Sequence, residues 1–279
     1  MCRHPPRFDR IARLVGLPAM EALARAHVAV FGLGGVGSFA AEALARSGVG
    51  HLTLVDGERV CETNVNRQLH ALEGTLGRPK VEVMAQRLAQ VAPAARIEPL
   101  AEFYDEASSE RLLAGPPDFV VDAIDSVVCK LHLLAACVRR GLPVISAMGA
   151  ARRLDATAVR VSDLSDSHTD QFAKDVRKYL RLRHGIASAG PTGILAVWSV
   201  EPAHEALTLP GDEEGVPGTR ARSPEELAQK RRPQKSHGSA AFVTGAFGLA
   251  AAGAVVQALT GVRPLPIPAG RERKKPRHR

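Results

Sequence analysis

Cysteine is scarce in this chain. Its 279 residues include four cysteines, Cys2, Cys61, Cys129 and Cys137. No two of them have the C-x-x-C spacing of structural zinc sites, so we expect no such site. A chain of this length with so few cysteines is typical of proteins that do not depend on disulfides. This favours a reducing, cytoplasmic location.

Strongly hydrophobic runs are also missing. The first ten residues, MCRHPPRFDR, contain no apolar stretch, and we therefore predict no signal peptide. The segment 238–262 is uncharged over a length that can span a bilayer, but it is built from alanine and glycine rather than leucine and isoleucine. That composition gives a weak insertion energy, so we expect a buried helix that packs closely through small residues. Membrane association of this segment is the alternative.

Acidic residues are fewer than basic ones. There are 37 Lys and Arg against 29 Asp and Glu, and the net charge of +8 favours an anionic partner such as nucleic acid, nucleotide or an acidic protein. Much of the excess lies in two clusters, 229–235 and 271–279. These clusters either contact nucleic acid or belong to solvated, disordered segments. Because 203–236 is rich in proline, glycine and charge, we predict a flexible loop there, and a disordered basic tail over 263–279.

Apolar strands alternate with helices along much of the chain, after an amphipathic helical segment at 7–26. The predicted strands are 27–31, 51–56, 95–103, 118–125, 143–149, 157–164 and 194–200, and helices are predicted from the glycine turn to about Gly48 and at 78–93, 127–141 and 169–185. This alternation predicts an α/β fold with a doubly wound, mostly parallel, Rossmann-like sheet, followed by C-terminal strands and the Ala/Gly-rich apolar helix. We predict a single domain over 7–262.

A glycine-rich turn, GLGGVG, directly follows the first strand. Gly32, Gly34 and Gly37 match the G-x-G-x-x-G pattern, in which one glycine permits a tight turn, one lets backbone approach phosphate, and one lets helix and strand pack closely. The following helix offers its N-terminal amides to an anion. Asp56 ends the second strand, where a carboxylate can accept hydrogen bonds from ribose hydroxyls. The pattern predicts an adenine-nucleotide site, and NAD is the first candidate.

The residues after Asp56 argue against a dehydrogenase. Asn64, Asn66, Arg67 and Gln68 lie together, and Lys80 follows at the start of a helix. A guanidinium, an ammonium and a helix N-terminus suit a polyphosphate and exceed what a dinucleotide needs. A polar surface loop is the alternative interpretation.

Two carboxylates follow a predicted strand near the middle of the chain. Asp122 and Asp125 lie at its C-terminal end, which is the edge where open α/β sheets bind ligands. A carboxylate beside a triphosphate favours Mg²⁺, which prefers oxygen ligands. We therefore expect a magnesium-bound nucleotide at this edge.

This ordered set of motifs resembles the ubiquitin-activating-like adenylating superfamily, which includes the molybdopterin and thiamine biosynthesis adenylyltransferases. The motifs are G-x-G-G-x-G, Asp56, N-x-N-R-Q at 64–68, Lys80 and D-A-I-D at 122–125. Whole segments, among them RFDRIARLVG, NVNRQLHAL and FVTGAFGLAAAGAV, are most similar to the tRNA threonylcarbamoyladenosine dehydratases. The resemblance implies an ATP-dependent cyclisation of threonylcarbamoyladenosine in tRNA through an adenylated carboxylate, with release of AMP and pyrophosphate.

The resemblance also implies residue roles. Asp56 would bind the ATP ribose, Asn64, Arg67 and Lys80 the phosphates, and Asp125 the Mg²⁺ ion. Arg10 would reach the phosphates of a partner subunit in a homodimer, although Arg7 and Arg13 are close enough in sequence to serve instead. The expected catalytic residues are Arg10, Arg67, Lys80 and Asp125. The expected nucleotide-binding residues are Gly32, Gly34, Gly35, Gly37, Asp56, Asn64, Arg67, Gln68, Lys80, Asp122 and Asp125.

The chain differs from other members of the superfamily in its cysteines, and these differences argue against a zinc site and a cysteine thioester. The chain lacks the paired C-x-x-C motifs of zinc-binding relatives, and no cysteine lies beyond Cys137, so a cysteine thioester is not expected. Two other functions stay open. One is an adenylyltransferase that activates the C-terminus of a small sulfur-carrier protein, and the other is a non-catalytic nucleotide-binding scaffold. A cysteine desulfurase or sulfur-acceptor system is a further possible partner.

Overall fold

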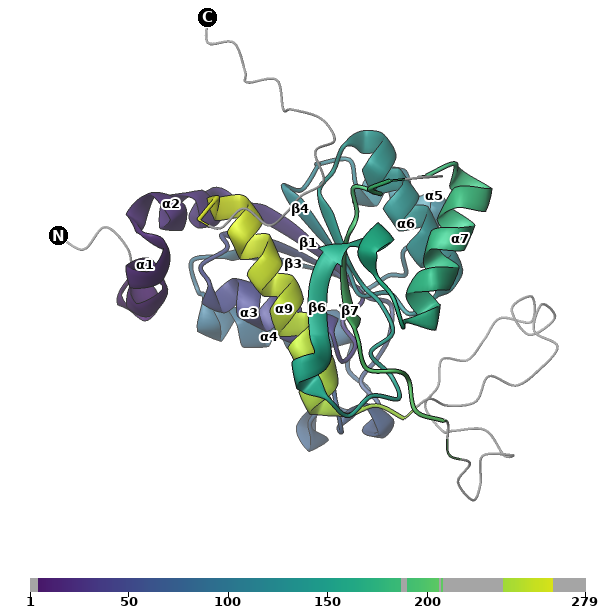
Figure 1. Cartoon of the computed structure of the whole chain (residues 1–279). Helices are drawn as coiled ribbons and strands as arrows, with labels where there is room; N and C mark the ends of the chain where they lie inside the picture. Colours follow the sequence, from purple (N-terminus) through teal and green to yellow (C-terminus); the bar gives the residue numbers. More distant parts are fainter. Residues whose placement is uncertain (1–4, 187–189, 206, 208–237, 263–279) are drawn as a thin grey trace, which may run out of the picture.

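A seven-stranded sheet forms the centre of the protein, with strand order β3-β2-β1-β4-β5-β7-β6 (Figure 1). The structure, a computed structural model, describes residues 5–186, 190–205, 207 and 238–262. The strands are β1 (His27–Phe31), β2 (His51–Val55), β3 (Arg96–Leu100), β4 (Phe119–Asp122), β5 (Val144–Ala147), β6 (Val159–Asp163) and β7 (Leu195–Ser199). All neighbours pair in parallel except β6 and β7, which are antiparallel. The predicted mostly parallel α/β sheet is confirmed.

Helices cover both faces of this sheet (Figure 1). On one face lie α2 (Leu17–Arg25), α3 (Gly37–Arg46), α4 (Lys80–Val91) and α9 (Ala241–Thr260), and on the other lie α5 (Glu106–Leu112), α6 (Val127–Arg140) and α7 (Gln171–His184). The inner strands are therefore apolar on both sides. In β1, Val28 and Val30 pack under the first helix layer, whereas Ala29 and Phe31 pack under the second. Such continuous apolar strands are expected in a parallel sheet.

Several predicted elements differ from the structure in their bounds. The helical segment at 7–26 is divided into η1 (Pro6–Phe8), α1 (Asp9–Val15) and α2. Gly16 separates the last two with a φ of +86°, and Pro18 is the second residue of the next helix, so one continuous helix is impossible there. Strand β3 ends at Leu100 and not at 103, and β4 ends at Asp122, which places Asp125 in the loop before α6. The loop predicted at 203–236 falls almost wholly, and the basic tail at 263–279 entirely, outside the described residues.

The apolar helix α9 packs against α3. A Cβ atom at Gly248 would lie 2.4 Å from the carbonyl oxygen of Val36 and 2.8 Å from Cβ of Phe39. This close approach confirms the predicted helix that packs through small residues. By length and composition α9 is also the one helix of the described residues that can cross a membrane, with a mean hydropathy of 1.7, yet 56% of that window is buried in the fold.

The chain segments on either side of 205–237 meet at one residue. The amide of Arg152 donates to the carbonyl of Gly238 at 2.8 Å, and the carbonyl of Arg152 accepts from the amide of His204 at 2.8 Å. Arg152 has a φ of +59°, which is unusual for a residue with a side chain. The backbone around β5 therefore holds the start and the end of this segment together.

We predict that Gly248→Ala destabilises the protein by about 1–3 kcal/mol, because the added methyl group has no space against α3. Gly253→Ala is the matched control on the same helix, since nothing lies within 4 Å of its Cβ position. That change should be neutral or stabilise by up to about 1 kcal/mol through helix propensity. Urea unfolding of both variants measures the difference, and equal midpoints would contradict the packing described.

Candidate functional site

The glycine turn lies between β1 and α3, at the point where the strand order reverses. Gly32 has a φ of +85°, and a Cβ there would lie 2.6 Å from the carbonyl oxygen of Ala123, which follows β4. A Cβ at Gly37 would lie 1.8 Å from the carbonyl oxygen of Gly32, so α3 packs directly on the turn. Gly34, in contrast, has nothing within 4 Å. The turn therefore leaves its backbone open to a ligand at Gly34, beside the N-terminus of α3.

Asp56 follows β2 and holds this turn in place. Its carboxylate accepts the amide of Leu33 at 2.6 Å through one oxygen and the amide of Glu58 at 2.8 Å through the other. Burial raises the pKa of Asp56, while the charge of Lys80 and the two amides act in the opposite direction. Each carboxylate oxygen has a second lone pair, so Asp56 can still accept a hydrogen bond from a ribose hydroxyl.

The N-x-N-R-Q segment combines structural and exposed side chains. Asn64 is buried and accepts the amide of Cys61 at 3.1 Å, which closes the short helix η2 (Glu62–Asn64). Asn66 is exposed and donates to the carbonyl of Ser239 at 2.8 Å, which ties the segment to the start of α9. Gln68 is buried, and its side-chain oxygen has no hydrogen-bond partner among the described residues.

Arg67 lies against the glycine turn. A Cβ at Gly35 would lie 3.2 Å from Cγ of Arg67, and one Arg67 guanidinium nitrogen donates to the carbonyl of Thr63 at 2.8 Å and to Asn66 Oδ1 at 2.9 Å. Burial lowers the pKa of Arg67, and the charge of Glu58 partly offsets this. Among the described residues no carboxylate forms an ion pair with it. A partly desolvated guanidinium in this position is suited to an anionic ligand.

Lys80 begins α4, as predicted, and is almost fully buried. Its ammonium group forms an ion pair with Glu58, a residue that the sequence analysis did not single out. The charge of Lys80 also acts on Asp56 and on His70. The structure thus brings Asp56, Arg67 and Lys80 to the glycine turn, with Glu58 as the partner that holds the ammonium group.

Asp122 is placed differently from the other predicted nucleotide-binding residues. It is fully buried, and one carboxylate oxygen contacts Lys130 Nζ at 2.6 Å and Ser146 Oγ at 2.5 Å. The other oxygen accepts the amide of Ile124 at 3.1 Å. Lys130 also donates to the carbonyl of Ala147 at 3.1 Å. These contacts hold the loop after β4 in place, and they turn the Asp122 carboxylate towards the interior of the protein.

Asp125 lies in that braced loop and is exposed. The loop touches the glycine turn, because Ala123 contacts both Gly32 and Gly37. In the described residues no group of three or more His, Cys, Asp or Glu side chains is arranged to hold a metal ion. A single carboxylate is nevertheless a fitting ligand set for Mg²⁺, which binds through one or two carboxylates, water and substrate phosphates.

Arg10 lies away from the turn within its own chain. It is exposed on α1, next to Phe8, which packs near Gly48 beyond the last residue of α3. The two nearby arginines have other partners, since Arg13 pairs with Asp9 at 2.8 Å and Arg7 donates to the carbonyl of Val91 at 3.0 Å. In the described part of the chain Arg10 makes no side-chain hydrogen bond or ion pair. The predicted role of Arg10 therefore requires a second subunit.

Two buried cations, of which Lys130 contacts Asp122, were not predicted from the sequence. Lys130 interrupts the apolar helix VVCKLHLLAAC, and a lone lysine in such a run is a detectable sign of a buried ion pair. Arg153 is 3% exposed, contacts Asp170 at 3.2 Å and donates to the carbonyl of Gly149 at 2.6 Å. Nothing in the local sequence around Arg153 marks it as buried, because its partners come from other segments.

Cys137 is placed as a small apolar side chain and not as a nucleophile. Burial raises the pKa of Cys137 to about 12, with a contribution from the charge of Asp122. A thiol with such a pKa is inert as a nucleophile at neutral pH. Cys129 lies half-buried on the same helix. Cys61 differs, because it accepts a hydrogen bond from the Thr63 hydroxyl, which lowers its pKa.

Comparisons with known proteins agree with this geometry. Residues 8–275 match the model of the ThiF family. The chain is 41% identical over 253 residues to the tRNA threonylcarbamoyladenosine dehydratase of Bacillus subtilis, covering 91% of this chain and 94% of the relative. The crystal structure of the Escherichia coli tRNA N6-threonylcarbamoyladenosine dehydratase in complex with ATP superposes with a TM-score of 0.77 at 35% identity, and the complex with AMP superposes with a TM-score of 0.78 at 34% identity. Both superpositions cover 91% of this chain and 94% of the relative. The E. coli molybdopterin-synthase adenylyltransferase is 36% identical over 53% of this chain and 59% of its own length.

His70 provides a test of the electrostatics at the site. It is 1% exposed, and neither ring nitrogen has a partner among the described residues. Burial, and secondly the charge of Lys80, lower the pKa of His70 from 6.5 to about 4. Between these values the unfolded chain binds a proton that the folded chain does not. Stability from this source is therefore complete above pH 6.5 and is lost as the pH falls towards 4.

We predict that this effect lowers the free energy of unfolding by up to about 3 kcal/mol between pH 6.5 and pH 4. The His70→Gln variant lacks the titrating ring, so its unfolding free energy should decline less steeply over the same interval. Urea unfolding of both proteins at intervals of pH measures the two slopes. Parallel curves would show that His70 is protonated in the folded state.

Proposed function

The chain belongs to the ThiF family, and on that basis we propose that it is an ATP-dependent enzyme that dehydrates threonylcarbamoyladenosine in tRNA. The observation that carries the proposal is the convergence of Arg67, Lys80 and Asp56 on an open glycine turn. This convergence occurs in a chain that matches a named dehydratase over nearly its whole length. The Escherichia coli relative binds ATP and AMP in its crystal structures, which are the substrate and one product of such a reaction.

The chemistry begins with two anions that repel one another. A carboxylate is a poor electrophile because its oxygen is a poor leaving group, and adenylation converts that oxygen into part of AMP. The carboxylate oxygen of the modified nucleoside attacks the α-phosphorus of ATP, and the bond to the β,γ-pyrophosphate breaks. The ring then closes when the carbamoyl group attacks the activated carbon and AMP leaves with the carboxylate oxygen. One water is thereby lost from the nucleoside overall.

The residues of this chain supply positive charge where the negative charge accumulates. The amides at Gly34 and at the N-terminus of α3 bind the inner phosphates, while Arg67 and Lys80 stabilise the departing pyrophosphate. Lys80 exchanges its contact with Glu58 for phosphate oxygens as the ligand enters. No protein nucleophile is required, because the attacking groups belong to the substrates and ring closure within one molecule gains from proximity.

We further propose Mg²⁺ as the metal, with Asp125 as its protein ligand. When bound, the ion would neutralise charge on the triphosphate and help the pyrophosphate to leave. Asp125 is suited to this because it is exposed on a loop that Asp122 and Lys130 keep rigid against the turn.

The remaining proposals concern assembly and location. A homodimer is supported by the position of Arg10 and by the exposed apolar side chains of α9, Phe242 and Leu249, which are 56% and 55% exposed. Membrane association through 238–262 would bury the same side chains, and we favour it less than the homodimer. A cytoplasmic location and a sulfur-transfer partner stay proposals that follow from the sequence alone.

The function is tested by incubating the protein with ATP, Mg²⁺ and tRNA that carries threonylcarbamoyladenosine. The modified nucleoside should lose the mass of one water, with one AMP and one pyrophosphate formed for each nucleoside converted, and chelation of Mg²⁺ should stop the reaction. Formation of ADP would contradict the proposal. So would AMP that accumulates only when a carrier protein with a C-terminal glycine is supplied, since that result identifies the sulfur-carrier adenylyltransferase instead.

The homodimer is tested by mixing two inactive variants. Arg10→Ala and Arg67→Ala should each lower the rate of AMP formation about a hundredfold or more. In a mixed dimer one of the two sites combines an intact Arg67 with an intact Arg10 from the other subunit. Because random exchange makes about half of the dimers mixed, mixing should restore roughly a quarter of the activity. Arg59→Ala, an exposed arginine on the same segment, is the control and should retain full activity. Failure to recover activity would place Arg10 outside the partner's site.

A further inference from the structure

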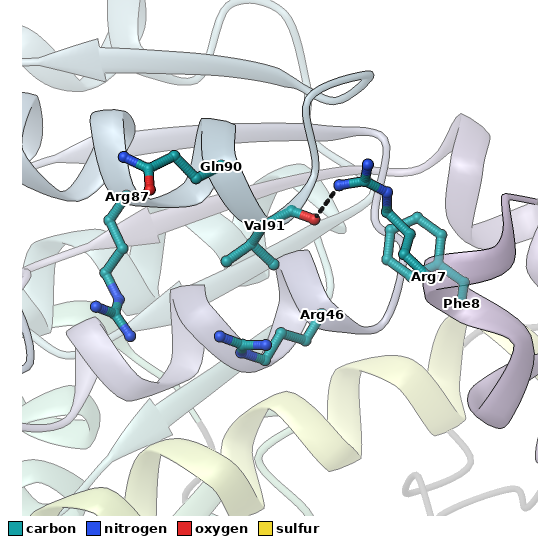
Figure 2. Close-up of a pocket in the computed structure, with 6 residues that line it drawn as sticks. All are labelled: Arg7, Phe8, Arg46, Arg87, Gln90 and Val91. Atoms are coloured by element: carbon teal, nitrogen blue, oxygen red, sulfur yellow. Dashed lines mark hydrogen bonds between the residues drawn. The ribbon is translucent and has the colours of Figure 1, made fainter.

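A basic pocket lies at the opposite end of α3 from the glycine turn. It is a cavity of about 420 Å³, lined by Arg7, Phe8, Arg46, Arg87, Gln90 and Val91 (Figure 2). Its walls come from three elements, the N-terminal η1, the last residue of α3 and the last two turns of α4. The three arginines are too far from the glycine turn to contact a nucleotide bound there in the same subunit, so their presence needs another explanation.

The positive charge of the pocket exceeds its negative charge. Arg46 and Arg87 share one buried carboxylate, Glu42, with nitrogen–oxygen distances of 2.7 and 2.8 Å. Arg7 donates to a main-chain carbonyl, that of Val91. Three guanidinium groups thus face one carboxylate, and arginine does not relieve such an excess by losing its proton. The C-terminal ends of α3 and α4 offset only a fraction of the excess, since each helix end carries about half a negative charge.

The arginines keep hydrogen-bond donors for a ligand. Arg87 contacts Glu42 through Nε and Nη2, and Arg46 also uses Nε and Nη2, so in both residues the Nη1 group is directed elsewhere. Figure 2 shows Arg87 and Arg7 on opposite sides of Val91, with Arg46 below it. Guanidinium groups spread in this way suit a chain of phosphates better than a single small anion.

From this geometry we propose that the pocket binds backbone phosphates of the tRNA whose modified nucleoside reacts at the glycine turn. The distance is suitable, because α3 has ten residues and spans about 15 Å. That length corresponds to about four or five nucleotides along one strand of a duplex. The pocket therefore lies within reach of the nucleotides that flank the reacting one. Phe8 and Val91 provide apolar surface against which a ribose can pack.

This proposal takes its RNA from the proposed function but is tested separately from it. The variant to use is Arg7→Gln combined with Arg87→Gln, because Arg46 then remains to pair with Glu42. Its Kd for tRNA, measured without ATP at several salt concentrations, should rise about tenfold or more. The slope of log Kd against log salt should fall by about 0.7–0.9 for each phosphate that the variant no longer neutralises. The affinity for ATP is compared in Arg87→Gln alone and should not change, since Arg87 is a helix length away from the turn and has no expected role in nucleotide binding.

Arg181→Gln is the matched control. Arg181 is also an exposed arginine in the last turn of a helix, but α7 lies on the other face of the sheet, so tRNA binding should be unaffected. Arg7→Gln alone covers the case in which the double variant fails to fold, because Arg7 has no carboxylate partner among the described residues. It should show a smaller loss in the same direction.

Three results would overturn the proposal. Unchanged tRNA affinity and salt dependence in a less stable variant would mean that the arginines only stabilise the helix ends. A loss of ATP affinity, or competition by inorganic phosphate at micromolar concentration, would mean that the pocket serves a small anion. An equal loss of tRNA affinity in the Arg181→Gln control would mean that tRNA binding depends only on the net charge of the protein. If the unsubstituted protein forms no AMP but the variant binds tRNA more weakly, the result supports the pocket and contradicts the proposed function.

Discussion

Close contacts between main-chain atoms at the glycine turn set the relative positions of the elements that carry the site. Gly37 packs so closely on the carbonyl of Gly32 that no side chain fits at position 37, and Gly32 in turn packs on Ala123 after β4. These contacts join the start of α3 to the loop that carries Asp125. Asp56 fixes the same turn from the side of β2 through the amide of Leu33. A shift at any of these contacts would move the amides of the turn and the carboxylate of Asp125 together.

Around this turn the charged side chains are stabilised before any ligand arrives. Lys80 is held by Glu58, and Asp122 is neutralised by Lys130 inside the core. A buried charge without a partner is costly, so removing one member of either pair would destabilise the fold. Arg67 differs, because its donors are engaged only by neutral oxygens from Thr63 and Asn66. Of these cations Arg67 is therefore the one that a polyphosphate can engage with the least rearrangement.

The sequence was sufficient to predict the parts that depend on local patterns. The apolar runs predicted the strands, and the spacing of Gly32, Gly34 and Gly37 predicted a turn whose three glycines differ in surroundings as expected. It did not predict the inward position of Asp122, because the partner Lys130 is eight residues away on the following helix and Ser146 comes from another strand. The pocket of Arg7, Arg46 and Arg87 was equally hidden, since it joins three elements whose ends meet only in the folded chain.

The hydrogen bonds that Arg152 makes to His204 and Gly238 have an evolutionary consequence. A segment that leaves and returns at the same residue can lengthen or shorten without moving β7 or α9, and the entropy of closing a longer loop grows only slowly with its length. Insertions between 205 and 237 are then nearly neutral for the sheet, while changes at Arg152 itself are not. In this chain that interval is therefore the natural position for an inserted reporter domain.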